Sequence, residues 1–389
     1  MRVYTGTTRG YTGTTMSGDI GRHASGSGTA GPDGRADTRP AWAVRAPMRV
    51  TDRGGASVAR LLERMRQSAF QGRKLGEAFH AWRQMIDGGG LVAIGLAGSL
   101  ASAGLGPLIT WLVERGYVDL VASTSANATE DLLESRGATF FQVDPDQPGD
   151  VELRRQGYYR FYDHVVSAQD YDDLEDFTGG FFRHLAATWP HPTITGVRFM
   201  RELGRWLDSQ GLAGCMAATC ARHAVPLFVP AAPDGPLAEG YRTAAGAGPV
   251  VDFFRDYQVA LSIMDRYMAP GPGTGAVYLG GGVPKDFLQI TATSVGALRG
   301  TSQASPHMAA IQITTDNTVF GGLGGAGVGT EAISWGKESP DGDNVMVFAD
   351  LTIALPLLCQ GLAEHYGPGH VRPARAAIAA HLRALLATV

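Results

Sequence analysis

The sequence has few cysteines and a small net charge, and each of these features argues against a class of function. Three cysteines occur in 389 residues, and Cys215, Cys220 and Cys359 form neither a CxxC pair nor a zinc-ligand pattern. Such a low, odd count is typical of buried thiols in a protein of the reducing cytoplasm. The formal net charge is −4, so we expect no basic face for nucleic acid.

Several motifs that mark a particular chemistry are also missing. The histidines show no HExxH or other metal-binding spacing, so no metal site is expected. No GxSxG elbow marks a serine nucleophile, and no GxGxxG stands between the first apolar strand and its helix. The N-terminus also lacks the compact apolar core of a secretory signal. The usual fingerprints of metal, serine-hydrolase and dinucleotide sites therefore do not apply.

One apolar run is long enough to be mistaken for a membrane span. Residues 91–113 carry no charge over about 23 residues, which is the length of a transmembrane helix. The run is full of Gly, Ala and Ser, however, and Pro107 interrupts it. A buried strand, a glycine-containing loop and a buried helix explain it better, so we expect no membrane segment.

Residues 1–44 differ from the rest of the chain. They are rich in Gly, Thr, Ser and Arg, and they contain few large apolar residues. Such a segment cannot bury enough apolar surface to offset the entropy of ordering it, so we predict a disordered tail. A targeting peptide, a regulatory arm, and a true start at Met16 or Met48 are the alternatives. Residues 45–389 would form the folded part.

Beyond the tail, short apolar strands alternate with helical segments. Apolar spacing predicts one helix over residues 58–86, or two with a break near Gly72. Strands are expected at 91–97, 118–124, 139–143, 226–231, 261–265, 275–281, 308–315 and 344–350, and helices at 104–116, 128–137, 199–210, 214–224 and 375–388. Residues 150–195 look like an insertion of helices and loops. This alternation predicts an α/β fold, a Rossmann-like parallel sheet flanked by helices.

Six turns of small or acidic residues follow six of these strands, where a parallel sheet binds its ligands. They are residues 95–104, 123–131, 230–240, 279–286, 314–327 and 349–351. Glycines and small hydroxyl residues let a backbone approach phosphates, and an acidic residue after a strand can bind ribose. Asp234 and Asp350 are candidates for ribose binding. A lone glycine turn is more often a packing turn than a ligand site, and a lone Asp after a strand is more often a helix cap, but six such turns in one sheet favour a ligand site.

Lys337 lies in GTEAISWGKESP, residues 329–340, and could be a surface charge or a nucleophile. A lysine nucleophile needs its pKa lowered from ~10.4 toward neutrality, usually by desolvation. Trp335 and Gly336 would allow desolvation, whereas the following polar turn would leave the amine exposed. Local composition alone favours an exposed lysine.

A wider set of motifs favours a nucleophile over a surface charge at Lys337. EAISWGK, LGGGVPK, PAAPDGPLAEG, TEDLL and VFADLTIALPLL together resemble the deoxyhypusine synthase family, which includes homospermidine synthases. The resemblance runs from about residue 45 to about residue 366, in the family's order. It implies that residues 45–389 are one NAD-binding catalytic domain with Lys337 as its nucleophile.

The chemistry that this resemblance implies is an NAD-dependent aminobutyl transfer. Spermidine is oxidised to an imine, a lysine takes the 4-aminobutyl group with release of 1,3-diaminopropane, and an acceptor amine receives it before NADH reduces the product. The acceptor is a lysine of the hypusine-bearing translation factor in deoxyhypusine synthases, which we favour, and putrescine in homospermidine synthases. A cytoplasmic homotetramer with active sites at subunit interfaces is also implied.

The resemblance assigns roles by position. Trp335 would stack on the polyamine methylenes, and Glu331 and Glu239 would bind its ammonium ends. NAD would be held by Gly98, Ser99, Ser102, Thr124, Ser125, Ala126, Asp234, Gly281, Thr315, Asp316 and Asp350.

The chain also departs from the family pattern. Asp286 stands where many members have a histidine, and would act as a base or an ammonium anchor. Glu239 stands where aspartate is common, and Thr129 replaces one of two glutamates, leaving Glu130 as a substrate ligand. The turn GGLGGAG, residues 321–327, lacks an aspartate that is often present. These departures favour the rival hypothesis, a non-catalytic protein that binds NAD or polyamine.

Overall fold

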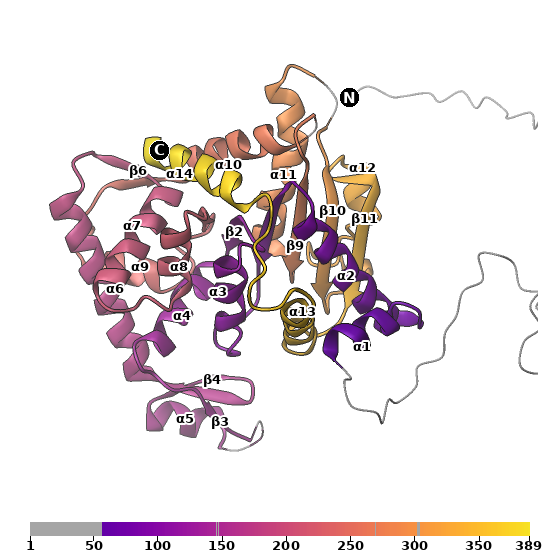
Figure 1. Ribbon diagram of the computed structural model, residues 1–389. Coiled ribbons are helices and arrows are strands. Elements are labelled where there is room, and N and C mark those ends of the chain that lie inside the picture. The colour runs from indigo at the N-terminus through magenta and orange to yellow at the C-terminus, as the bar shows by residue number, and fades with distance from the viewer. Residues whose placement is uncertain (1–56, 145, 147, 269, 302–303) are drawn as a thin grey trace, which may run out of the picture. The chain divides into compact units, whose positions relative to one another are not determined.

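A six-stranded parallel sheet forms the centre of the molecule (Figure 1). The computed structural model describes residues 57–389 except 145, 147, 269 and 302–303. The strand order is β11-β10-β9-β1-β2-β7. The strands are β1 (Leu91–Leu96), β2 (Leu120–Ser123), β7 (Leu227–Phe228), β9 (Thr274–Leu279), β10 (His307–Thr314) and β11 (Glu338–Phe348). The predicted α/β fold with a parallel sheet is confirmed.

Helices cover both faces of this sheet because alternate side chains of β1 point to opposite sides. Val92 and Ile94 pack in one core cluster with α1 (Val58–Met65), α2 (Phe70–Asp87), α3 (Gly106–Glu114) and α13 (Leu351–Tyr366). Leu91 and Ala93 pack in a second cluster with α10 (Phe253–Tyr267), α11 (Gly282–Leu298) and α14 (Arg375–Thr388). A strand buried on both faces reads as a continuous apolar run, which is how β1 was recognisable.

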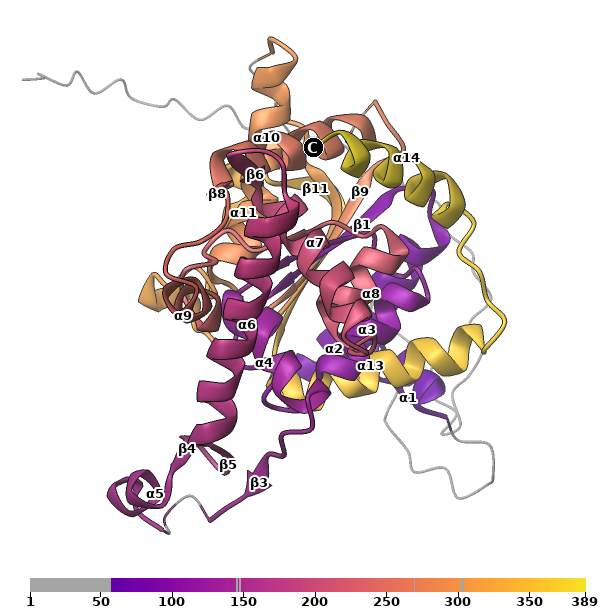
Figure 2. The same cartoon turned by 90° about the vertical axis from the view of Figure 1, so that its left-hand side faces the viewer.

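A further group of helices packs together near β7 at one edge of the sheet. They are α4 (Ser125–Ser135), α6 (Ala168–Thr188), α7 (Gly196–Ser209), α8 (Met216–His223) and α9 (Pro236–Thr243). A short parallel pair, β6 (Thr193–Thr195) and β8 (Val250–Asp252), joins this group. Figure 2 shows α5 (Asp150–Gln156) with β3 (Phe141–Gln142), β4 (Tyr158–Phe161) and β5 (His164–Ser167) beyond one end of α6. These three strands form a small antiparallel sheet.

Several predicted elements need correction. Residues 261–265, predicted as a strand, lie inside α10, because Val259, Ala260, Ile263, Met264 and Tyr267 are buried at helical spacing. The first helix break falls at residues 66–69, and Gly72 lies within α2. Helix α4 begins at Ser125 with Thr124 as its cap, earlier than predicted. The insertion over residues 150–195 contains strands as well as helices, and residues 139–143 supply a strand to the small sheet.

The apolar run over residues 91–113 folds as β1, a turn and α3. Among the helices of the described residues, none has both the length and the apolar character needed to cross a bilayer. The predicted tail over residues 1–44 lies outside the described residues, and the domain boundary at residue 45 stays a prediction.

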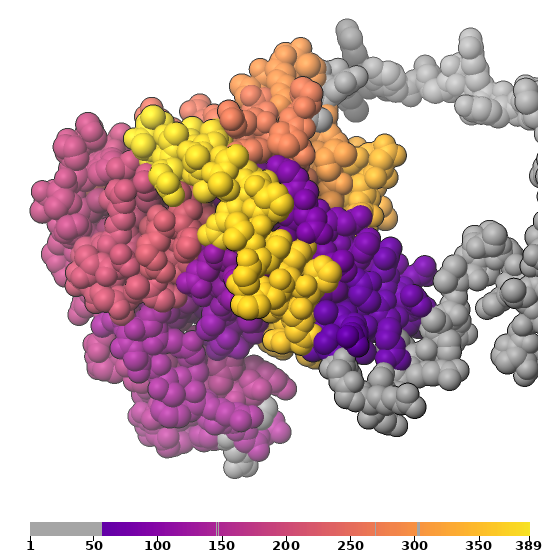
Figure 3. All heavy atoms as spheres, viewed as in Figure 1, coloured from indigo at the N-terminus to yellow at the C-terminus, as the bar shows by residue number. Residues whose placement is uncertain are grey.

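The C-terminal segment lies along one face of the molecule, in yellow in Figure 3, and leads from α13 to α14. Arg372, between these helices, is fully buried and donates from Nη1 to Asp119 Oδ2 at 2.5 Å. Asp119 Oδ2 also accepts from the Val92 backbone N–H at 2.8 Å. This ion pair therefore joins the segment before α14 to the beginnings of β1 and β2.

Candidate active site

A cleft of about 380 Å³ opens at the carboxyl ends of β1, β9, β10 and β11. The strand order reverses direction between β1 and β9, which is where doubly wound sheets bind ligands. The lining residues come from four strand-ending turns: Ala97, Gly98, Ser99, Leu100 and Ala103; Gly280, Gly281 and Gly282; Thr314, Thr315 and Asp316; and Ala349, Asp350, Leu351 and Thr352.

The lining fits a ligand that carries phosphate and ribose. Gly98, Gly280 and Gly282 have φ of +80°, +81° and +63°, a backbone conformation that brings N–H groups to a turn surface at little cost only for glycine. Asp350 caps α13, because its Oδ1 accepts from the Thr352 N–H at 2.7 Å and from the Thr352 hydroxyl at 2.6 Å. These bonds lower the pKa of Asp350 below its ordinary value. Its second oxygen can serve a hydroxyl ligand.

The structure brings six of the eleven predicted cofactor residues to this cleft. They are Gly98, Ser99, Gly281, Thr315, Asp316 and Asp350. The other five lie outside its lining, in the turn after β1 for Ser102 and after β2 and β7 for Thr124, Ser125, Ala126 and Asp234. Ser125 Oγ donates to the Ala232 carbonyl at 2.9 Å, and Ser102 Oγ donates to the Ser99 carbonyl at 3.2 Å. These hydroxyls already have structural partners.

Asn127, which carries no predicted role, organises the first turn of the cleft. Its Oδ1 accepts from the N–H groups of Leu100 and Ala101, at 2.9 and 3.2 Å. Its Nδ2 donates to the Gly98 carbonyl at 2.7 Å. The side chain is buried, so this amide fixes the turn between β1 and α3. In the sequence, the signal for this role was an amide residue, Asn127, within a turn of small residues.

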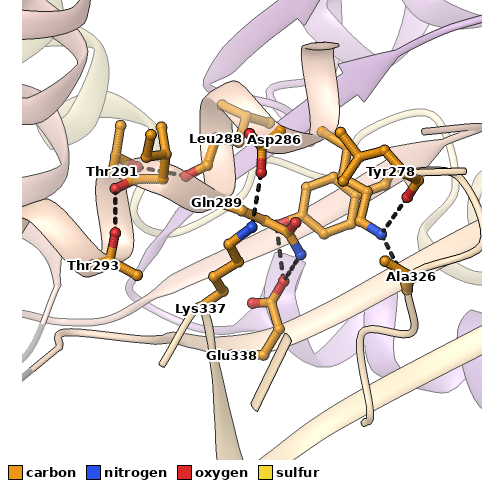
Figure 4. Close-up of polar contacts among 12 residues, drawn as sticks. Tyr278, Asp286, Leu288, Gln289, Thr291, Thr293, Ala326, Lys337 and Glu338 are labelled. Atoms are coloured by element: carbon orange, nitrogen blue, oxygen red, sulfur yellow. Dashed lines mark hydrogen bonds and ion pairs between the residues drawn. The ribbon is translucent and has the colours of Figure 1, made fainter. Parts of the chain in front are cut away.

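Lys337 stands just before β11 and forms an ion pair with Asp286 on α11. Lys337 Nζ donates to Asp286 Oδ1 at 2.8 Å, and Figure 4 shows the lysine extended toward this carboxylate. The ammonium also lies 5.7 Å from the centroid of the Trp335 ring. Asp286 is four residues beyond Gly282, about 6 Å along the helix axis, and Gly282 lines the cleft.

The EAISWGK motif folds as a short helix and a turn that present these side chains. Glu331 opens α12 (Glu331–Ser334), and its Oε2 accepts from the Gly327 N–H at 2.6 Å. Gly336 has a φ of +69°, and the Lys337 N–H donates to the Ala332 carbonyl at 2.9 Å. Trp335 is 70% exposed. A large apolar ring left in solvent beside a lysine is available to a ligand or to another chain.

A second lysine, Lys285, is adjacent to Asp286 but is fully buried. Its Nζ donates to Gln312 Oε1 at 3.0 Å, to the Leu323 carbonyl at 3.2 Å and to the Ala326 carbonyl. Burial lowers the pKa of Lys285 to about 8, yet three acceptors match the three protons of an ammonium. Lys285 is therefore engaged and inaccessible, and Lys337 is the better candidate for a nucleophile.

Glu338, directly after Lys337, was not singled out in the sequence. It is buried, and its Oε1 accepts from Gln289 Nε2 at 2.7 Å and from the Tyr278 hydroxyl at 3.1 Å (Figure 4). Burial raises the pKa of Glu338 to about 8. The consecutive residues Lys337 and Glu338 thus both contact α11. Lys337 forms a partly exposed ion pair with Asp286, and Glu338 is a buried acid that accepts from Gln289.

Two predicted substrate ligands lie elsewhere. Glu239 on α9 pairs with Arg242 at 2.5 Å, and Glu130 on α4 accepts from the Tyr171 hydroxyl at 2.8 Å. Burial raises the pKa of Glu130. The partners of these carboxylates are Arg242 and Tyr171, and their helices belong to the group near β7, at the opposite edge of the sheet from β11. Their predicted roles stay predictions.

Known proteins are similar to this chain in sequence. The family model described as deoxyhypusine synthase matches residues 60–362. "Probable deoxyhypusine synthase 2" of Methanosarcina acetivorans is 33% identical over 312 residues, which cover 79% of this chain and 87% of that protein. The chain belongs to the deoxyhypusine synthase family. The matched region contains the cleft, Asp286 and Lys337.

Two further comparisons concern a second archaeal relative and a solved structure. "Probable deoxyhypusine synthase 2" of Archaeoglobus fulgidus is 33% identical over 300 residues, covering 77% of this chain and 95% of that protein. The crystal structure of a "putative deoxyhypusine synthase" from Entamoeba histolytica covers 79% of this chain and 93% of its own, with a TM-score of 0.54 and 15% identity. At that identity the structure supports the shared fold alone.

Proposed function

We propose that this deoxyhypusine synthase family member is an NAD-dependent aminobutyltransferase. It moves the 4-aminobutyl group of spermidine, through an imine on Lys337, to a lysine of the hypusine-bearing translation factor. The observation that carries the proposal is the ion pair of Lys337 with Asp286 at 2.8 Å, next to Trp335, because Asp286 lies on α11 and the first residue of that helix, Gly282, lines the cleft. We also propose a cytoplasmic homotetramer, as the family resemblance implies.

The cleft residues suit NAD, which would accept a hydride from the polyamine and return it to the product. The glycine turns at Gly98 and at Gly280–Gly282 would face its phosphates, where backbone N–H groups can approach closely. Asp316 and Asp350 at the rim would accept hydrogen bonds from ribose hydroxyls. Asn127 would contribute indirectly by fixing the turn that contains Gly98.

Lys337 would act by transimination. Its ammonium first gives a proton to Asp286, whose carboxylate already accepts the N–H at 2.8 Å. The neutral amine then attacks the imine carbon, a new C–N bond forms, and the bond to the 1,3-diaminopropane nitrogen breaks. The leaving amine takes up the proton, and the aminobutyl group stays on Lys337 as an iminium beside Asp286. An acceptor amine reverses these steps and frees Lys337.

Trp335 and Glu331 would hold the substrate. The exposed indole offers an apolar, electron-rich face to the methylenes and ammonium groups of a polyamine. Glu331 is exposed, so its carboxylate can reach a substrate ammonium from α12.

The test is mass spectrometry of the full chain after incubation with NAD and spermidine and trapping with borohydride. We expect an aminobutyl adduct on Lys337 in the wild type and none in Lys337→Ala. Lys74→Ala removes a partly exposed lysine of α2 and should keep the adduct. No adduct and no diaminopropane from the wild type would contradict the proposed reaction.

The acceptor is tested by adding candidates to the untrapped protein that has been loaded with spermidine and NAD. A translation-factor substrate that carries the hypusine lysine should remove the aminobutyl group from Lys337 and gain it. Transfer to putrescine alone would instead identify a small-amine acceptor.

A further inference from the structure

A buried glutamine connects the cleft to the turn that precedes the EAISWGK motif. Gln312 lies on β10 and is fully buried. Its Nε2 donates to the Gly280 carbonyl at 3.0 Å and to the Gly324 carbonyl at 2.8 Å. Gly280 lines the cleft, whereas Gly324 belongs to the glycine-rich turn over residues 321–327. One amide group therefore holds both turns.

Lys285 adds a second connection to the same turn. Its ammonium donates to Gln312 Oε1, and also to the carbonyls of Leu323 and Ala326 in the glycine-rich turn. Lys285 precedes Asp286, the partner of Lys337, on α11. We call Gln312 and Lys285, with these bonds, the Gln312 clamp.

The two turns are also in direct contact. A Cβ atom on Gly281 would lie 2.2 Å from Gly324 Cα, so the backbones touch with no side chain between them. The glycine-rich turn then continues to Gly327, whose N–H donates to Glu331 at the start of α12. A shift of the Gly280–Gly282 turn would break buried hydrogen bonds unless residues 321–327 moved with it.

We propose that Gln312 and Lys285 are positioning residues that couple the cleft to the lysine motif. A ligand that orders Gly280–Gly282 also orders residues 321–327, and so fixes α12, Trp335 and Lys337 for reaction. Neither residue touches the reacting atoms. The inference rests on the proposed function in one respect, which is that NAD is the ligand of the cleft.

Hydrogen–deuterium exchange of the full chain, with and without NAD, tests this coupling without a measurement of activity. At saturating NAD, we expect amide exchange over residues 321–337 to slow at least about fivefold in the wild type, the lower end of usual coupling factors. Gln312→Met removes both donors to the turns and the acceptor for Lys285, and Gln312→Glu keeps that acceptor but loses both donors. Both variants should bind NAD, more weakly, and lose the protection of residues 321–337.

Gln289→Met is the matched control. Gln289 is also a buried amide, but it donates to Glu338 and contacts neither turn. It should keep the protection. If the wild type bound NAD without protection of residues 321–337, or if a folded Gln312 variant kept the protection, the clamp would be wrong. If the wild type did not bind NAD, the proposed function itself would fail, and the coupling with it.

Discussion

At the residue scale, Asp286 is the partner of Lys337, and in the proposed reaction it takes the proton that Lys337 must lose. The carboxylate that stabilises the ammonium is also the nearest acceptor for its proton. We predict that Asp286→Asn slows formation of the Lys337 adduct by about 10²- to 10⁴-fold, the usual loss on removal of a general base. Asp286→His restores a base and should recover much of the rate. Quenched single-turnover trapping with mass spectrometry measures it.

Asp208→Asn is the control for this series, because Asp208 is a surface partner of Arg222. Its adduct rate should equal that of the wild type. An unchanged rate in Asp286→Asn would mean that another group takes the proton from Lys337.

Glu338 gives the protein a pH-dependent stability of known sign. Its pKa is raised from an ordinary value of 4.5 to about 8 in the folded chain, because the carboxyl is buried. Between these values the unfolded chain has lost the proton and the folded chain keeps it, so the free energy of unfolding falls as pH rises.

Glu338→Gln should remove this contribution, which is at most about 1.4 kcal/mol per pH unit. Urea unfolding from pH 5 to pH 8 should therefore show a smaller loss of stability in the variant than in the wild type. Glu152→Gln, in an exposed pair with Arg155, should follow the wild type. Parallel curves for Glu338→Gln and the wild type would show that Glu338 ionises normally.

At the element scale, the turn between β9 and α11 has no space for a side chain where it meets the glycine-rich turn. Gly281→Ala would put a Cβ 2.2 Å from Gly324 Cα. We predict a loss of about 1–3 kcal/mol in the free energy of unfolding, as in other overpacked sites, together with weaker NAD binding. Denaturant unfolding and NAD titration measure the two effects.

Gly322→Ala is the matched control, since a Cβ there meets nothing within 4 Å. It should change unfolding and NAD binding much less. If both variants behaved alike, contact between the two turns would not limit this region.

The sequence predicted the strands of the main sheet well because buried parallel strands are short apolar runs between small-residue turns. It failed at residues 261–265, where an apolar run of strand length belongs to the buried face of α10. Periodicity over five residues cannot separate these cases. The order of β9, β10 and β11 next to β1 follows from tertiary packing that no local pattern encodes.

The residues of the candidate site also fall into two groups, those that the sequence indicated and those that it did not. Lys337, Trp335 and Glu331 were predicted because one short motif contains all three, and Asp286 because its turn resembles a family motif. Gln312 and Asn127 were missed, because each acts through backbone groups of distant turns. MAAIQITT reads only as a strand. The role of its glutamine follows only from the folded structure, where Gln312 donates to the carbonyls of both Gly280 and Gly324.

At the scale of the whole molecule, one buried ion pair holds the C-terminal segment to the sheet. Arg372 and Asp119 are both buried, and burial raises the pKa of Asp119 while the arginine opposes that rise. Arg372 also donates to the carbonyls of Gly90 and Gly116, near the starts of β1 and β2. The pair thus joins the C-terminal segment to the starts of β1 and β2.

Arg372→Met should lower the free energy of unfolding by about 3–5 kcal/mol, because it leaves Asp119 as an unpaired buried charge. Adding Asp119→Asn should recover part of this loss, because no buried charge then remains. Arg383→Met is the control, since Arg383 lies on the exposed side of α14, and it should have little effect. Denaturant unfolding gives the free energies, and limited proteolysis reports whether α14 detaches first. If Arg372→Met were as stable as the wild type, α13 and α14 would hold this segment by apolar packing alone, and the ion pair would contribute orientation rather than stability.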